Sequence, residues 1–136
     1  KPVGTVRTPD RSGTVRPAVP VTIGGAMFRL HEAVTPAEQA LGLGALDSLA
    51  PDEGMLFRFG SPGVHPIWMK GMRYAIDILW VGADQTVVHV ERSVSPETYP
   101  TVFGNPAERP AVAVIELPAG TADRHAIGAG AVVTLP

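Results

Sequence analysis

Two acidic residues interrupt apolar stretches of the sequence and are the first candidates for chemistry. Asp77 is the one residue of the segment 74–81 (YAIDILWV) that is charged at neutral pH, and Glu116 stands in the segment 111–117 (AVAVIEL). A carboxylate in an apolar strand must be paired, hydrogen-bonded or neutralised. Two such groups about 5–10 Å apart could act as general acid and general base in glycoside hydrolysis. The structural alternatives are that Asp77 accepts backbone N–H bonds and holds a loop, and that Glu116 forms a salt bridge at the sheet rim.

A second group of candidates lies in the segment 65–77 (HPIWMKGMRYAID). Strand alternation places Trp68 and Lys70 on one face if the strand continues. An aromatic ring beside cationic donors is typical of a site for a sugar or a carboxylate. The alternative is a core tryptophan, with Lys70 or Arg73 neutralising Asp77. The predicted ligand-binding set comprises Trp68, Lys70, Arg73, Asp77 and Glu116, and no catalytic residue is assigned.

The composition argues against metal, cofactor and nucleic-acid chemistry. The chain has no cysteine, and its four histidines are far apart in sequence, without metal-ligand spacing. No serine stands in a G-x-S-x-G context. Lys and Arg number 11 against 13 Asp and Glu, without a basic run, so we expect no nucleic-acid partner. No apolar run approaches the roughly 18 residues that span a bilayer, so we expect no transmembrane segment.

These candidates must be positioned by short elements, because the 136 residues include 15 Gly and 14 Pro. So many helix-breaking residues exclude a helical bundle or coiled coil. A capping box at Thr35 with Pro36 predicts a helix over 36–41, and 121–127 can form one or two helical turns. The predicted strands cover residues 21–23, 27–30, 55–59, 65–69, 74–81, 86–91, 111–117 and 131–135. The expected fold is mainly β (β-rich α+β), a single compact sandwich or barrel-like antiparallel sheet with one or two short helices.

The N-terminal segment differs in composition from the rest of the chain. Residues 1–20 contain four prolines and few large apolar residues, which predicts a flexible tether before a single domain over 21–136. The sequence begins with Lys1 and not with Met. We therefore expect that an N-terminal segment was removed and that the protein is exported, as a periplasmic, extracellular or lipid-anchored protein. A trimmed cytosolic protein is the alternative.

Five motifs occur in an order that resembles the DUF192 family of small bacterial and archaeal domains. They are EQALGLGAL, DEGMLFRF, HPIWMKGMRYAIDILWV, AVIELPAG and IGAGAVVTL, and the resemblance covers residues 21–136. It implies a compact, mainly β fold with small helices, often exported or lipid-anchored, and no established activity. The chain keeps the tryptophan, lysine, aspartate and glutamate of these motifs. It departs at Gly44, Gly71 and Ala75, where the family usually has Met, Asn and Pro, and it lacks an arginine common after the first motif.

The leading functional hypothesis is a non-enzymatic extracytoplasmic domain that binds a small ligand or serves as an accessory module. Its partner would be a sugar or a small carboxylate, held by Trp68 with charged groups at the rim. One alternative is a glycoside-type hydrolase that uses Asp77 and Glu116. The other is a structural or interaction module tethered to the cell envelope. The sequence leaves the oligomeric state open.

Overall fold

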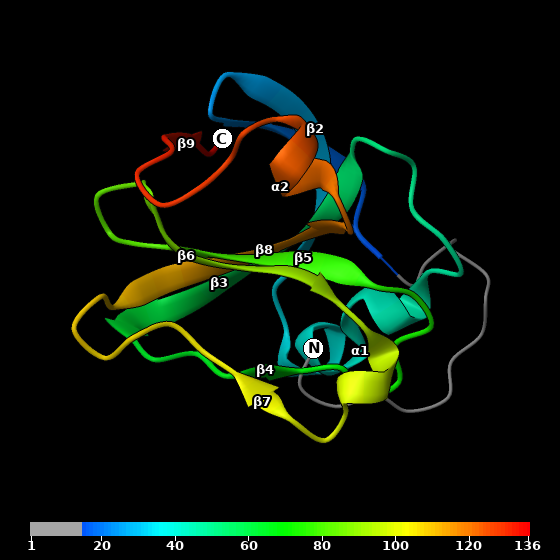
Figure 1. The fold of residues 1–136 in the computed structure, drawn as a ribbon. Helices are drawn as coiled ribbons and strands as arrows, with labels where there is room; N and C mark the ends of the chain where they lie inside the picture. The colour runs from blue at the N-terminus through cyan, green and yellow to red at the C-terminus, as the bar shows by residue number, and fades with distance from the viewer. Residues whose placement is uncertain (1–14) are drawn as a thin grey trace.

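The computed structural model describes residues 15–136 and contains a strongly curled sheet (Figure 1). The first fourteen residues of the predicted tether therefore lie outside the described residues. The sheet strands are β1 (Ala18–Ile23), β2 (Ala26–Ala33), β3 (Glu53–Gly63), β5 (Ile76–Val81), β6 (Val87–Val94), β8 (Ala111–Pro118) and β9 (Val133–Thr134). Strand β1 begins at Ala18 and thus includes the last residues of the segment predicted as a tether.

Four helical turns and a small second sheet complete the described part of the chain. The small sheet pairs β4 (Ile67–Trp68) with β7 (Val102–Phe103). The helical elements are α1 (Pro36–Leu41), the 3₁₀ turn η1 (Gly42–Ala45), the 3₁₀ turn η2 (Pro96–Thr98) and α2 (Thr121–Arg124). The mainly β class with short helices is as predicted.

The seven strands follow the order β6-β5-β8-β3-β2-β1-β9, and the two outer strands meet at one end. Val87 N–H donates to the Ala131 carbonyl at 2.9 Å, and Val133 N–H donates to the Gln85 carbonyl at 2.8 Å. The sheet is therefore a half-barrel, which confirms the barrel-like form of the prediction. The expectation of purely antiparallel pairing is wrong at β2 and β3, which run parallel. Their connection holds α1 and η1, and such a crossover returns the chain in the same direction.

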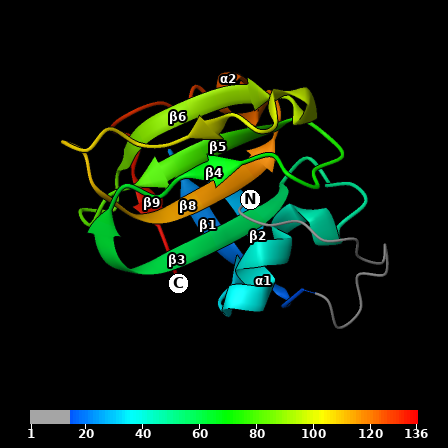
Figure 2. The ribbon, with the colours of Figure 1, turned by 90° about the horizontal axis from the view of Figure 1, so that it is seen from below.

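Each face of the sheet carries its own apolar core. In the orientation of Figure 1, the upper cluster packs beneath α2, and its larger members are Phe28, Leu30, Leu56, Leu79, Ile115, Leu117 and Ile127. The lower cluster packs against η1 and β4, and its larger members are Leu43, Leu46, Phe57, Met69, Ile76, Ile78 and Trp80. Seen from below, α1 and β4 lie in front of the sheet (Figure 2). Strand β5 is buried at all its positions because both faces are covered, as its apolar sequence predicted.

Local capping signals set the helix between β2 and β3. The Thr35 hydroxyl accepts the Glu38 N–H at 3.1 Å, and the Glu38 carboxylate accepts the Thr35 N–H at 2.9 Å. The helix ends where Gly42 adopts φ 51°, a conformation that glycine reaches without strain. The predicted capping box with Pro36 and the predicted helix over 36–41 are therefore confirmed.

Candidate functional site

Asp77 is a fully buried anchor on the upper face of the sheet. One carboxylate oxygen accepts the Ser93 N–H at 2.8 Å and the Gly120 N–H at 3.3 Å, and the other accepts the Ala122 N–H at 2.8 Å. These bonds hold the end of β6, where Ser93 has φ 51°, and the start of α2. The structural interpretation of Asp77 as an acceptor of backbone N–H bonds is therefore confirmed.

Glu116 projects from the opposite face of the sheet. The register pairs Glu116 with Ile78, and Asp77 with Leu117. Directly paired residues share a face and neighbours along a strand alternate, so Asp77 and Glu116 lie on different faces. Glu116 is also fully buried, because β3 and β5 flank its strand on both sides. The expectation that it lies at the sheet rim is therefore wrong. The two carboxylates do not border a common site, and this geometry does not support their use as an acid–base pair.

Trp68 and Lys70 come together, but not by the predicted strand alternation. Strand β4 ends at Trp68, and the chain turns at Gly71, where φ is 76°. The Lys70 Nζ then lies 5.6 Å from the centroid of the Trp68 ring, a cation–π distance. The Tyr99 ring packs edge-on against the same tryptophan at 5.1 Å between centroids. The buried Trp68 Nε1 has no hydrogen-bond partner among residues 15–136.

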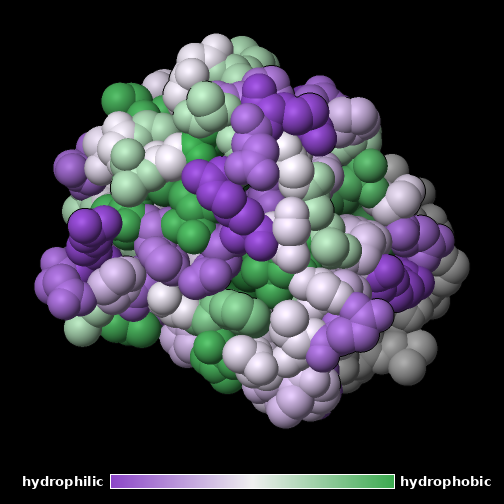
Figure 3. Space-filling model, viewed as in Figure 1, coloured by the Kyte–Doolittle hydropathy of each residue, from purple (hydrophilic) through white to green (hydrophobic). Residues whose placement is uncertain are grey.

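The half-buried Trp68 ring forms one wall of a depression with a volume of about 270 Å³. We name it the Trp68 depression, and it is lined by Pro66, Ile67, Trp68 and Val102. All four side chains are apolar, and Val102 is 58% exposed. The surface on the side shown in Figure 3 carries several separate apolar groups among polar residues. The Trp68 depression is therefore an apolar hollow with a cation near its aromatic wall.

Arg73 does not belong to this cluster and does not neutralise Asp77. Its guanidinium contacts Asp47 at 2.8 Å and donates to the carbonyls of Gly44 at 3.1 Å and Leu46 at 3.2 Å. These contacts hold the loop that follows η1. Arg73 also lines a separate open depression of about 340 Å³, together with the neighbouring Tyr74. Of the five predicted ligand-binding residues, Trp68 and Lys70 thus lie together, whereas Arg73 and Asp77 are held by other partners.

A second apolar hollow adjoins the first and was not predicted. This aromatic depression has a volume of about 200 Å³ and is lined by Gln39, Phe57, Phe59, His65, Pro66 and Ile67. The Phe59 and His65 rings stack with centroids 3.9 Å apart and planes 8° from parallel. His65 lies three residues before Trp68 in the same motif, and this proximity was the one available signal.

Asn105 supports the loop between the two depressions and was also missed. It is 4% exposed, accepts the His65 N–H at 3.0 Å, and donates to the carbonyls of Gly63 at 3.0 Å and Arg109 at 2.8 Å. Its position in an irregular Pro-rich segment gives no periodic signal. Asn105 therefore positions the wall of the site by contacts that span about 40 residues of sequence.

A buried histidine and glutamate form a further pair that sequence reasoning did not single out. His31 Nε2 and the Glu53 carboxylate are 2.6 Å apart, and His31 Nδ1 donates to the Arg16 carbonyl at 2.6 Å. Strands β2 and β3 run parallel, and Met55 lies opposite His31. Glu53 stands two residues before Met55 and therefore on the same face of the sheet, within reach of His31. The pair fixes the segment that enters β1, and neither residue lines either depression.

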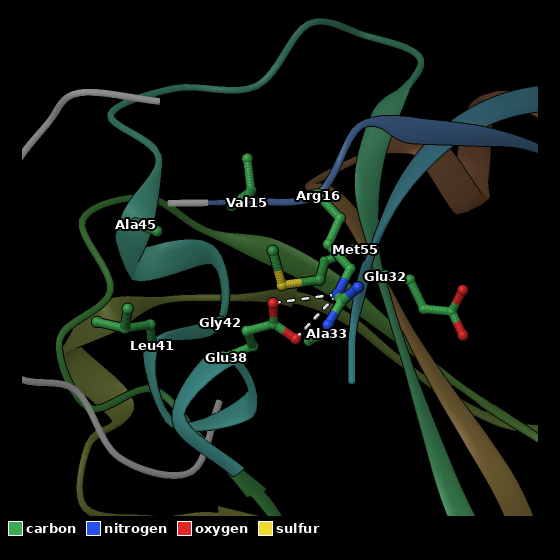
Figure 4. Close-up of a pocket in the computed structure, with 9 residues that line it drawn as sticks. All are labelled: Val15, Arg16, Glu32, Ala33, Glu38, Leu41, Gly42, Ala45 and Met55. Carbon is green, nitrogen blue, oxygen red and sulfur yellow. Dashed lines mark hydrogen bonds and ion pairs between the residues drawn. The ribbon is translucent and has the colours of Figure 1, made fainter. Parts of the chain in front are cut away.

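The cavity beside α1 is too small for an organic ligand (Figure 4). Its volume is about 10 Å³, which is room for one water molecule at most. Arg16 and Glu38 form an ion pair there with 3.1 Å between nitrogen and oxygen. Hydrogen bonds from the backbone of Thr35 and Val34, with the Arg16 charge, lower the pKa of Glu38 to about 2. This contact is part of the helix cap.

Two classes of site are absent from the part of the chain that the structure describes. No three or more metal-ligating side chains converge within residues 15–136. In the same range, no helix has the length and apolar character to cross a membrane.

Solved structures of similar proteins share this fold. A protein of unknown function from Novosphingobium aromaticivorans DSM 12444 is 31% identical, with a TM-score of 0.79, and the match covers 97% of this chain and 100% of that one. A protein from Sinorhizobium meliloti 1021, provisionally called a transcription regulator, is 27% identical, with a TM-score of 0.76 over 88% of this chain and 94% of that one.

Comparison with known families agrees with the motifs found in the sequence. No curated protein matches the chain. The model of the family DUF192, described as "Uncharacterized ACR", matches residues 19–135. This match spans β1 to β9 and includes both depressions. The chain therefore belongs to the DUF192 family.

Proposed function

We propose that this domain binds a small molecule in the Trp68 depression. The observation that carries the proposal is the half-buried Trp68 ring, which walls an apolar hollow of about 270 Å³ and lies 5.6 Å from the Lys70 ammonium. Binding sites for small molecules are typically concave and mostly apolar, with a few polar groups that fix orientation. The hollow and its adjacent cation have these features.

The lining favours one of the two ligand classes that the sequence suggested. A sugar needs several hydrogen-bonding side chains around it, whereas the four lining residues are apolar. A carboxylate with an apolar body would place that body against Trp68 and its charge toward Lys70. Aromatic stacking and burial of apolar surface would supply the affinity, and the ammonium would supply the orientation. We therefore favour an apolar carboxylate over a sugar.

Other hypotheses have less support from the geometry. The hydrolase requires two carboxylates at one site, and Asp77 and Glu116 lie on opposite faces. The name of the Sinorhizobium protein suggests nucleic acid, but the net charge of this chain is -2. Exposed apolar side chains near the hollow, Val64, Tyr99 and Val102, favour the interaction module as the second candidate. In that case size-exclusion chromatography would show a larger species for the native chain than for Val102→Ser.

The chain provides an internal control for a binding test, because it has two tryptophans. Trp80 is fully buried and donates its indole N–H to the His65 carbonyl at 2.8 Å. A ¹H–¹⁵N spectrum should show both indole resonances, and Trp68→Phe assigns them. Titration with benzoate or octanoate should shift the Trp68 signal more than the Trp80 signal and raise the melting temperature. If benzoate, octanoate, glucose and hexylamine all leave the Trp68 signal unmoved, the proposal is wrong.

We also propose that the domain acts outside the cytoplasm. The support is the composition of residues 1–20, which are rich in proline and poor in large apolar side chains. Segments of this kind often join an exported domain to its anchor. Fractionation of cells that express the native gene should place the protein outside the cytoplasm, and recovery in the cytosol would contradict this proposal.

A further inference from the structure

The Trp68 depression and the aromatic depression are neighbours that share two lining residues, Pro66 and Ile67. We propose that one ligand occupies both: a linear carboxylate, its charge beside Lys70 and its alkyl chain across Pro66 against Phe59 and His65. This inference rests on the proposed function and names the class of ligand. It follows from three features, namely the junction of the two hollows, their walls and the charge beside Trp68.

The junction between the two hollows exposes few polar backbone groups. The His65 N–H donates to Asn105 at 3.0 Å, and the His65 carbonyl accepts the Trp80 indole N–H at 2.8 Å. Pro66 has no N–H at all. An alkyl chain that crosses this point would therefore displace water without leaving these backbone groups unpaired, which is the condition for favourable burial of apolar surface.

The walls of the aromatic depression are mostly apolar, and its two polar side chains, Gln39 and His65, have partners within the fold. The Gln39 amide donates to the carbonyls of Ala33 at 3.2 Å and Arg58 at 3.3 Å. The His65 Nε2 contacts the Ser61 carbonyl at 3.2 Å while its ring stacks on Phe59. This hollow thus presents ring faces and aliphatic groups, which suit the uncharged end of a ligand.

Lys70 places a positive charge beside the Trp68 ring. The Lys70 Nζ lies 5.6 Å from the Trp68 ring, and Lys70 keeps its own contacts within the fold. A carboxylate beside Lys70 would gain a favourable interaction with the ammonium, which an alcohol of equal length would lack. The two hollows together therefore offer mostly apolar walls with one cation near the Trp68 ring, which suits an amphipathic anion.

Calorimetric titration with butanoate, hexanoate, octanoate and decanoate tests the length of the site. We expect affinity to rise about three- to fourfold for each added methylene until the chain fills the aromatic depression, as burial of methylene groups predicts. 1-Octanol should bind at least about tenfold more weakly than octanoate, and Lys70→Gln should remove most of this difference.

A pair of variants locates the distal end of the chain. Phe59→Ala should weaken decanoate binding at least about tenfold and leave butanoate binding unchanged. Met27→Ala is the matched control, because Met27 is 61% exposed and lines neither hollow. If Phe59→Ala fails to fold, a nuclear Overhauser effect between the decanoate methyl group and the Phe59 ring of the native protein shows where the chain ends.

The outcomes separate the two proposals. Equal affinity for butanoate and decanoate, or a decanoate methyl group remote from Phe59, would overturn the two-hollow ligand while binding at Trp68 stands. Binding of benzoate or a sugar at Trp68, with no binding of any alkyl carboxylate, would also overturn the ligand class alone. Failure of every compound to move the Trp68 resonance would overturn the proposed function itself.

Discussion

The two faces of the curled sheet treat their unusual side chains in opposite ways. On the upper face, the Asp77 carboxylate is fully buried and accepts three backbone N–H bonds. On the lower face, the Trp68 ring is half-buried beside an open hollow, and its indole N–H lacks a partner among residues 15–136. Buried groups whose bonding is complete contribute to stability, whereas an incompletely covered aromatic surface is available to a ligand. Asp77 therefore contributes to stability, and Trp68 is the centre of the proposed binding site.

The strongest test of this assignment is Asp77→Ala. The substitution leaves three N–H groups without acceptors, one of them at the fully buried Ala122, and we expect a loss of about 3 kcal/mol in the free energy of unfolding. Urea denaturation of both proteins at neutral pH measures this difference. A loss below about 0.5 kcal/mol would show that the carboxylate is not an anchor. Binding of octanoate at Trp68 should remain unchanged in whatever fraction of the variant is folded.

A second test concerns the close packing of strands on the upper face. A Cβ added at Gly54 would lie 2.3 Å from the Glu116 carbonyl oxygen and 2.9 Å from Leu117, so the backbone must move. Gly54→Ala should cost about 2 kcal/mol or more, because overpacking strains a dense core. Gly60→Ala is the matched control in the same strand, since a Cβ at Gly60 meets nothing within 4 Å. Equal melting temperatures for the two variants would contradict this account.

The sequence predicted the local elements better than the long-range contacts. The capping box at Thr35 and the helix over 36–41 depend on neighbouring residues and were correctly predicted. The parallel pairing of β2 with β3 depends on how a 19-residue connection returns to the sheet, which no local pattern specifies. The opposite faces of Asp77 and Glu116 follow from the register between β5 and β8, which alternation within one strand does not determine.

The site itself was predicted in part. Trp68 and Lys70 do meet, but through a turn at Gly71 in place of a continued strand. Gly71 stands where the family motif usually has asparagine, and its φ is positive. Glycine and asparagine are the residues that adopt this conformation most readily. The departure thus keeps the turn. Asn105 was missed because its hydrogen bonds join segments about 40 residues apart in the sequence. Phe59 was missed because its role depends on ring stacking, which the sequence pattern does not show.

A third test separates the helix cap on the lower face from the binding surface. The pKa of Glu38 is lowered from 4.5 to about 2, so its ionised form stabilises the folded state above pH 4.5. This contribution is lost as the pH falls from about 4.5 to 2. The unfolded chain binds the proton at Glu38 near pH 4.5, whereas the folded protein binds it only near pH 2. Thr35→Ala should cost about 1 kcal/mol at pH 7.

The control for the cap is Glu38→Gln, which keeps the hydrogen-bonding oxygen and removes the charge. Urea denaturation between pH 2 and pH 7 should show that the native protein loses its advantage over this variant on acidification. A constant difference in unfolding free energy across that range would contradict the role of the ionised carboxylate.

The smallest effect on stability should come from Trp68→Phe. Phenylalanine keeps an apolar ring at the wall of the hollow and removes a buried N–H that has no partner within residues 15–136, so the two changes offset each other. We expect a change of less than about 1 kcal/mol in the free energy of unfolding, together with a clear loss of affinity for octanoate. A loss as large as that of Asp77→Ala would make Trp68 a core residue and would remove the contrast between the two faces. A small loss combined with unchanged binding would retain that contrast and place the ligand elsewhere on the molecule.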